Sequence, residues 1–256
     1  MTEQSVVVDR IQPPARSLVC QTADTYRRHL GQDLVSLVAH GSAVKGGLIP
    51  GSSDVDLVAF LRPHGLTPHG ELPLDVAIRL HRDLSRIDPA PFRYIQGIVL
   101  PAGDRSRIRF IPESYCVVLG DRDVPIATAD QLMREARAAL DTLEPERLAA
   151  PISNALLDQG EGRLFRQVRG LCTVVWPLMY QVACIYHGNA VHVWQRTKFE
   201  VAEMLTAEPA IGPPLSRWMD AVTHHYDNGE NSSTALEAIR AGVSFLDAAD
   251  EWYRHL

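Results

Sequence analysis

At 256 residues the chain is long enough for one large domain or two modest ones, and we expect two. Hydrophobic residues make up 46% of the chain and charged residues 22%, a composition that excludes general disorder. The formal net charge of −6, without a basic stripe along the sequence, excludes a generic nucleic-acid binder.

Helical and strand-like patterns alternate through the first part of the chain. After a lead-in over residues 1–14, which we expect to be mobile, the spacing of apolar residues in Ala15–His29 predicts a first helix. Two short apolar runs, Leu34–Ala39 and Asp54–Leu61, have the length and composition of buried strands, and glycine-rich turns lie between them. We therefore expect a strand, a tight turn and a second strand.

A helix and two further strands should follow. Leu74–Ile87 carries apolar residues at mostly helical spacing, whereas Phe92–Leu100 and Ile108–Leu119 are rich in β-branched and aromatic residues. Pro112 interrupts the last of these runs, which predicts an edge position or a bulge.

From Thr128 onward the patterns are helical. Thr128–Gln131 and Thr234–Glu237 both have the sequence of a capping box, and each begins an apolar helical stripe. We place the boundary at residues 121–127 and expect domains of residues 1–124 and 125–256. The predicted fold class is α/β (α+β), a short mixed sheet flanked by helices and followed by an all-α domain.

Cysteine usage and apolar segments bear on the cellular compartment. The cysteines lie far apart without a C-x-x-C pair, so we expect buried thiols rather than disulfides or a structural zinc at Cys20, Cys116, Cys172 and Cys184. The N-terminus lacks the apolar region of a secretory signal. The longest apolar stretch, Leu171–Tyr186, is interrupted by Pro177 and falls short of a membrane span. We expect a cytoplasmic protein without a membrane partner, as a monomer or homodimer.

The most informative segment runs from Leu37 to Leu57. Gly41 and Ser42 end the first expected strand, where small residues let backbone N–H groups and a hydroxyl approach phosphate oxygens. Strand residues two apart project from one face, so Asp54 and Asp56 can offer adjacent carboxylates to one hard divalent cation. Each feature alone would be an ordinary loop or an Asx turn, but together they predict phosphate and metal binding at one place.

This segment resembles the G-S-x(n)-G-x-S-D-x-D motif of DNA polymerase β-like nucleotidyltransferases, especially aminoglycoside adenylyltransferases and kanamycin nucleotidyltransferase-like proteins. The order of elements, a minimal transferase domain before a helical domain, agrees with that superfamily over nearly the whole chain. The resemblance implies Mg²⁺-dependent transfer of a nucleoside monophosphate, usually AMP from ATP, to a hydroxyl of a small molecule. It assigns Mg²⁺ to Asp54 and Asp56, and the phosphates of the nucleoside triphosphate to Gly41, Ser42 and Ser53.

The sequence departs from the family pattern at the third acid. The family has a carboxylate on a later strand, which completes the metal site and in many members acts as base on the acceptor hydroxyl. In this chain Gln96 aligns with that position, and a glutamine cannot accept a proton. Asp88, Asp104 and Glu113 are the fallback candidates, although each has the sequence context of a surface carboxylate.

In the helical half, Gly188–Lys198 is similar to the adenylyltransferase segment in which a lysine opens a helix and reaches the nucleotide phosphates. This makes Lys198 a candidate nucleotide ligand, with a solvated lysine as the alternative.

Three histidines fit hydrogen-bonded packing better than the role of a general base, and they are His40, His187 and His192. Four aromatic residues occur at helical spacing, which predicts that their side chains pack in a core rather than line a substrate cleft. They are Trp176, Tyr180, Trp194 and Trp252.

Two functions of different classes follow from these patterns. The first is an enzyme that nucleotidylates a hydroxyl of a small polar acceptor, for instance an aminoglycoside-like antibiotic, in a cleft between the two domains. The second is a catalytically degenerate nucleotide-binding or antitoxin-like module, for which Gln96 is the motivation. The net acidity disfavours a third function, a polymerase acting on nucleic acid.

Overall fold

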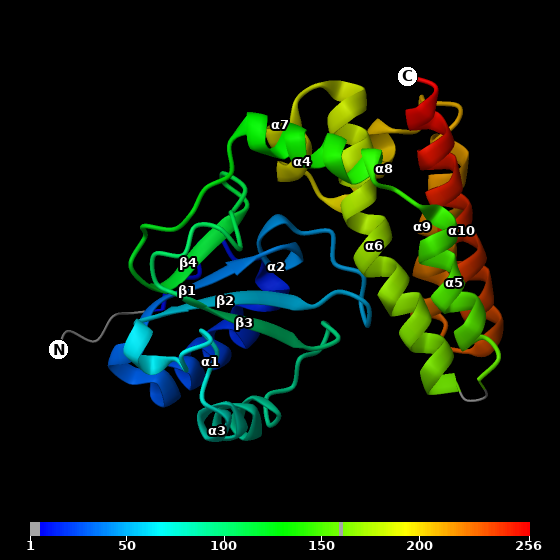
Figure 1. The fold of residues 1–256 in the computed structure, drawn as a ribbon. Coiled ribbons are helices and arrows are strands. Elements are labelled where there is room, and N and C mark those ends of the chain that lie inside the picture. The colour runs from blue at the N-terminus through cyan, green and yellow to red at the C-terminus, as the bar shows by residue number, and fades with distance from the viewer. Residues whose placement is uncertain (1–5, 159–160) are drawn as a thin grey trace. The chain divides into compact units, whose positions relative to one another are not determined.

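The chain divides between Ala127 and Thr128 into two units, each with its own core. The structure, a computed structural model, describes residues 6–158 and 161–256 (Figure 1). The N-terminal unit contains a sheet, and the C-terminal unit contains helices alone among its described residues.

A four-stranded mixed sheet forms the centre of the N-terminal unit. Its strands are β1 (Leu34–His40), β2 (Val55–Leu61), β3 (Ile95–Pro101) and β4 (Tyr115–Gly120), in the spatial order β3-β2-β1-β4. β1 is antiparallel to β2 and to β4, whereas β3 runs parallel to β2. The predicted fold class, with a short mixed sheet followed by helices, is confirmed.

Helices cover one face of this sheet, as Figure 1 shows. They are α1 (Pro13–Leu30) and α3 (Leu74–Leu84). Helix α2 (Ser42–Lys45) is a single turn in the connection between β1 and β2. Two 3-10 turns occupy Gly31–Asp33 and Pro63–Gly65. The stripe predicted for α1 is buried against the sheet, since Leu18, Val19, Thr22 and Tyr26 are all at most 4% exposed. The apolar period of 3.6 residues therefore identified both the helix and its buried face.

The lead-in is more ordered than expected. The Val7 N–H donates to the Val118 carbonyl oxygen at 2.9 Å, and Ile11 is 1% exposed in the core. The expectation of a mobile segment is thus wrong for residues 6–14, because backbone pairing with β4 and burial of Ile11 fix them. Residues 1–5 lie outside the described part of the chain.

Only the second half of Ile108–Leu119 forms a strand. β4 begins at Tyr115, and Phe110 instead enters the core on the other face of the sheet, where it is 2% exposed and contacts Phe60 edge to face. β4 occupies an edge of the sheet, as Pro112 predicted, but the proline itself lies in the preceding turn. Burial of a large aromatic ring outweighs continuation of the strand.

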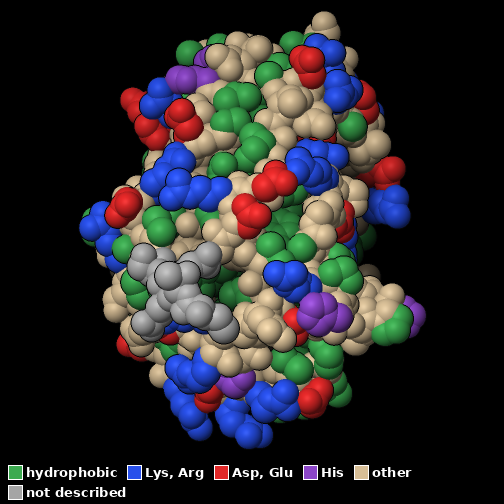
Figure 2. Space-filling model, turned by 90° about the vertical axis from the view of Figure 1, so that its left-hand side faces the viewer, with side chains coloured by type: hydrophobic (Ala, Val, Ile, Leu, Met, Phe, Trp, Pro, Cys, Tyr) green, Lys and Arg blue, Asp and Glu red, His purple; other side chains and the backbone are tan. Residues whose placement is uncertain are grey.

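Arginines of α1 and α3 are interspersed with acidic residues. Asp83 of α3 pairs with Arg28 (3.3 Å), His29 (2.8 Å) and Arg86 (2.9 Å). The His29 hydrogen bond, together with these positive charges, holds the pKa of Asp83 below its ordinary value. At the lower end of the face in Figure 2, Lys and Arg side chains gather with some Asp, Glu and His side chains among them. The ion pairs help to join the two helices without forming a purely basic surface.

Seven helices make up the described part of the C-terminal unit. They are α4 (Ala129–Asp141), α5 (Pro145–Ala155), α6 (Glu161–His187), α7 (Ala190–Gln195), α8 (Lys198–Met204), α9 (Gly212–Asp227) and α10 (Ser232–Arg254). The long helix α6 packs against α4, α7 and α10, and α9 packs against α10. The core of this unit therefore lies around α6.

The two predicted capping boxes have different outcomes. At Thr128 both reciprocal bonds are present, with the Gln131 N–H donating to Thr128 Oγ1 and the Thr128 N–H donating to Gln131 Oε1. The second prediction is wrong, because α10 begins at Ser232 and Asn231 is its N-cap. Thr234 instead lies in the first turn, where its hydroxyl contacts His225 at 2.8 Å.

Helix α6 continues through Pro177, which interrupts the apolar stretch Leu171–Tyr186 without ending the helix. By length and composition, Gly162–His187 would suffice to cross a membrane, so the expectation that this region falls short of a span is wrong. In the protein 56% of its most apolar window is buried, as in the core helix of a helical bundle. The cysteines form no disulfide. Three of them are buried as expected, namely Cys116, Cys172 and Cys184, whereas Cys20 is half-buried, contrary to expectation.

Candidate active site

The β1–β2 connection brings Gly41 against Asp56. Gly41 has a φ of +66°, a conformation that favours glycine, and a Cβ at this position would lie only 2.3 Å from Asp56 Oδ2. A side chain larger than hydrogen would therefore displace the carboxylate. The first glycine of the predicted motif is thus required by the backbone conformation and by the close approach of an acid.

The two serines of the motif stabilise the same connection. The Ser42 hydroxyl donates to the backbone carbonyl of Asp54 at 3.2 Å, and the Ile49 N–H donates to Ser53 Oγ at 3.0 Å. Ser53 is only 6% exposed, so its observed contact is structural. Phosphate contacts by Gly41, Ser42 and Ser53 stay predictions.

Asp54 and Asp56 lie at the beginning of β2. Asp54 directly precedes the strand, Asp56 is its second residue, and both are half-buried. Val55 between them is fully buried in the core shared with α1. Because successive side chains of an extended chain point to opposite faces, the two aspartates should share the face away from α1. The placement of both carboxylates on one side of the sheet stays a prediction from the alternation.

Gln96 lies beside Asp56 on the neighbouring strand. The parallel register of β2 and β3 pairs Asp56 with Gln96, and paired residues of adjacent strands project from the same face. The Tyr94 hydroxyl donates to Gln96 Oε1 at 2.8 Å. The position next to the two acids is therefore occupied by an amide and a phenol.

Gly97 helps to hold β3 in this register. A Cβ on Gly97 would lie 2.1 Å from the hydroxyl oxygen of Tyr26, which is buried in α1. A shift of the β3 register by one residue would bring a side chain into this contact. The shift would also turn Gln96 to the opposite face of the sheet. Packing against α1 thus favours the observed position of Gln96.

The fallback acids do not join this group. Asp88 is exposed and accepts a hydrogen bond from the Ala90 N–H, and Asp104 lies beyond the far end of β3, bonded to Ser106. Glu113 precedes the edge strand β4, and β1 separates β4 from β2. No group of three or more His, Cys, Asp or Glu able to hold a metal occurs within residues 6–158 and 161–256.

His40 flanks Asp56 on the other side. It is the register partner of Asp56 in β1, and its ring contacts Phe110 edge to face with centroids 5.6 Å apart. Burial, and secondarily the positive charge of Lys45, lower the pKa of His40 to about 4. The imidazole is therefore neutral near pH 7, which agrees with its expected packing role.

Acidification should destabilise the metal-free protein through His40. The unfolded chain takes up a proton near the ordinary pKa of 6.5, whereas the folded protein does so only near pH 4. The free energy of unfolding should therefore decrease as the pH falls through this window, by at most about 3 kcal/mol. Urea unfolding in EDTA, compared between the wild type and His40→Gln, measures this contribution. An identical pH dependence in both proteins would contradict it.

Lys198 opens α8 in the C-terminal unit, as predicted. Thr197 is the N-cap, in a capping box with Glu200, and Lys198 Nζ lies 5.2 Å from the ring centroid of Trp176. Tyr180 stacks on Trp194 nearby, with centroids 4.6 Å apart, and its hydroxyl donates to the Arg196 carbonyl. These aromatic residues pack within the unit, and nucleotide contact by Lys198 stays a prediction.

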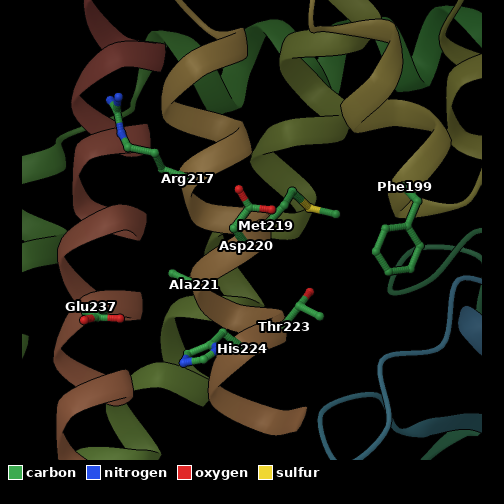
Figure 3. A pocket seen from close by; sticks show the side chains of 8 residues that line it. All are labelled: Phe199, Arg217, Met219, Asp220, Ala221, Thr223, His224 and Glu237. Carbon is green, nitrogen blue, oxygen red and sulfur yellow. The ribbon is translucent and has the colours of Figure 1, made fainter. Parts of the chain in front are cut away.

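A shallow hollow of about 750 Å³ also lies on the C-terminal unit. Figure 3 shows Phe199 at one side and Arg217 and Glu237 at the other, with residues of α9 between them. It contains none of the site residues predicted from the sequence. The remaining lining residues are Met219, Asp220, Ala221, Thr223 and His224.

Comparison with models of protein families and with curated proteins gives no match to the sequence. Among solved structures, the chain is similar to spectinomycin adenyltransferase AAD(9) from Enterococcus faecialis, which was determined with ATP and spectinomycin. The match has a TM-score of 0.52 and covers 92% of this chain and 99% of that chain, at 11% sequence identity. The chain shares its fold with that protein. At this level of identity the likeness establishes the fold alone.

The donor set at the start of β2 has the chemistry that suits a magnesium ion. Asp54 and Asp56 present hard oxygen donors on one face, and proteins commonly hold Mg²⁺ through one or two carboxylates together with substrate phosphates and water. With Gln96 in the third place, the chain would supply two charged ligands. The remaining ligands would have to come from the nucleotide and solvent.

Sequence reasoning did not single out Tyr94, whose hydroxyl donates to Gln96 Oε1. The pattern Tyr94-Ile95-Gln96 has the same alternation as Asp54-Val55-Asp56, which was the available signal. Interpreting that signal requires the register pair of Asp56 with Gln96, which the sequence does not show.

Proposed function

We propose that this chain is a nucleotidyltransferase that binds the magnesium complex of a nucleoside triphosphate on its N-terminal unit and transfers the nucleoside monophosphate to a hydroxyl. The observation that carries the proposal is the pair of carboxylates, Asp54 and Asp56, beside the constrained Gly41 in a chain with an adenyltransferase fold. Because AAD(9) was determined with ATP and spectinomycin, ATP and a small polar acceptor are the substrates to test first.

The residues of the site have separate tasks in this proposal. Asp54 and Asp56 hold Mg²⁺, which neutralises phosphate charge and helps to orient the phosphates for in-line attack. Gly41 and Ser42 form the turn against which the phosphates lie. Gln96 can accept a hydrogen bond from the attacking hydroxyl and orient it, but an amide oxygen cannot retain the proton. Catalysis then rests on positioning and charge rather than on a general base.

A second candidate function is a nucleotide-binding module that does not turn over. Gln96 favours it, because the position beside Asp56 carries no third carboxylate. The two candidates share the metal and nucleotide site and differ in whether pyrophosphate is released.

Substitution of either aspartate should weaken nucleotide binding while preserving the fold. Asp54→Asn and Asp56→Asn each remove one negative ligand at nearly constant volume, so the affinity for ATP at fixed Mg²⁺ should fall at least about tenfold. Calorimetry measures the affinity, and circular dichroism checks the fold. The matched control is Asp104→Asn at the far end of β3, where an asparagine can still accept from Ser106. Unchanged affinity in both site variants would exclude this metal site.

Activity is tested by pyrophosphate release from ATP and Mg²⁺ with spectinomycin, other aminoglycosides and lincosamides as acceptors. Release that depends on an acceptor and is lost in Asp56→Asn supports transfer. Binding of ATP without release across this panel supports the non-catalytic module.

A further inference from the structure

We propose that Tyr94 is itself an acceptor of this site, so that the chain transfers a nucleoside monophosphate to its own Tyr94 hydroxyl. This inference rests on the proposed nucleotide site but goes beyond it, because it identifies a modification site and the class of acceptor, a phenol.

The backbone places Tyr94 directly before β3, as Asp54 directly precedes β2. The Val55 N–H donates to the Tyr94 carbonyl oxygen at 3.1 Å, within the first register pair of the two strands, Val55 with Ile95. Gln96 is the register partner of Asp56, and the Tyr94 hydroxyl donates to the Gln96 side chain. The Tyr94 hydroxyl therefore lies on the face of the sheet that carries Gln96 and Asp56.

The Tyr94 hydroxyl already makes the contact expected of an acceptor. In a transfer of this type, the attacking hydroxyl donates a hydrogen bond to the group that stands beside the metal-binding acids. Here the Tyr94 hydroxyl donates to Gln96 Oε1 at 2.8 Å. The bond directs the phenol proton toward the amide.

A phenol also suits a site without a carboxylate base. A phenolic hydroxyl is much more acidic than the alcohol of a sugar, so its proton can be lost to water as the new bond forms. Gln96 is exposed and Tyr94 is half-buried, so solvent can reach this pair. The lack of a carboxylate at the Gln96 position should therefore lower the rate of attack by Tyr94 less than the rate of attack by an alcohol.

The step balances without a further reactant. A bond forms between Tyr94 Oη and the α-phosphorus of the nucleoside triphosphate, and the bond from that phosphorus to the bridging oxygen breaks. Pyrophosphate leaves with the bonding electron pair, and the phenol proton passes to water. The product is a phosphodiester between Tyr94 and one nucleoside.

The test uses the full chain with Mg²⁺ and each of ATP, GTP, CTP and UTP labelled at the α-phosphate. After denaturation and washing, we expect one covalent nucleoside monophosphate per chain, located by peptide mass mapping at Tyr94, and no retention of a γ-phosphate label. Tyr94→Phe, which lacks only the hydroxyl, should lose the label, as should Asp56→Asn. The matched control Tyr115→Phe, on the edge strand β4, should keep it.

A second measurement does not depend on turnover. A non-hydrolysable ATP analogue with Mg²⁺ should protect Tyr94 from nitration, because the nucleotide would lie against its hydroxyl. Label at another residue, or no label in a protein that binds nucleotide and shows protection, overturns the inference and leaves the nucleotide site standing. Failure of all four nucleotides to bind overturns the site itself.

Discussion

Gln96→Glu should raise the rate of nucleotidyl transfer, whether to an added acceptor or to Tyr94. Gln96 is the register partner of Asp56, so the new carboxylate would stand beside the two existing acids. It would also keep an oxygen that can accept from the Tyr94 hydroxyl, which now donates to Gln96 Oε1 at 2.8 Å. A glutamate there can both ligate the metal and accept the proton, and general-base assistance is typically worth roughly 10² to 10⁴ in rate. Pyrophosphate release and α-phosphate labelling both measure the gain.

The double variant Gln96→Glu with Asp56→Asn is the matched control. It has the same number of carboxylates as the wild type but lacks one of the original ligands, so the gain should disappear. A lower rate in Gln96→Glu alone would mean that the neutral amide has a task of its own, such as avoiding repulsion of the triphosphate.

Gly41→Ala should abolish measurable binding of ATP and Mg²⁺. The added Cβ would lie 2.3 Å from Asp56 Oδ2, a separation that no packed pair of atoms tolerates, so the carboxylate must move. The positive φ of Gly41 adds a backbone strain of about 1–3 kcal/mol, which lowers stability but should leave the fold intact. Calorimetry for binding and urea unfolding for stability separate the two effects.

Gly31→Ala provides a closely matched control. Gly31 has a φ of +53°, and a Cβ there meets nothing within 4 Å. This variant should therefore show a similar backbone strain with unchanged nucleotide affinity. Equal losses of affinity in the two variants would point to general destabilisation, and retained affinity in Gly41→Ala would exclude Asp56 from the binding site.

Two features that depend on neighbours in sequence were predicted correctly. The buried stripe of α1 follows from the helical period, and the capping box at Thr128 follows from side chains three residues apart. The shared face of Asp54 and Asp56 is an inference of the same kind, from strand alternation. The sequence by itself therefore determined the order of helices and strands in the N-terminal unit and the pair of acids at the start of β2, because each requires only local geometry.

Tertiary packing decided which residues complete the site. Phe110 left the expected strand because the core on that face of the sheet buries its ring. Helix α10 begins at Ser232 with Asn231 as its N-cap, and the Thr234 hydroxyl contacts the buried His225 instead of capping the helix. Alignment to a family motif proposed Gln96, but its place beside Asp56 depends on the pairing of β2 with β3. That pairing joins residues about forty positions apart, and its register depends on contacts such as that of Gly97 with Tyr26, so no local pattern could specify it.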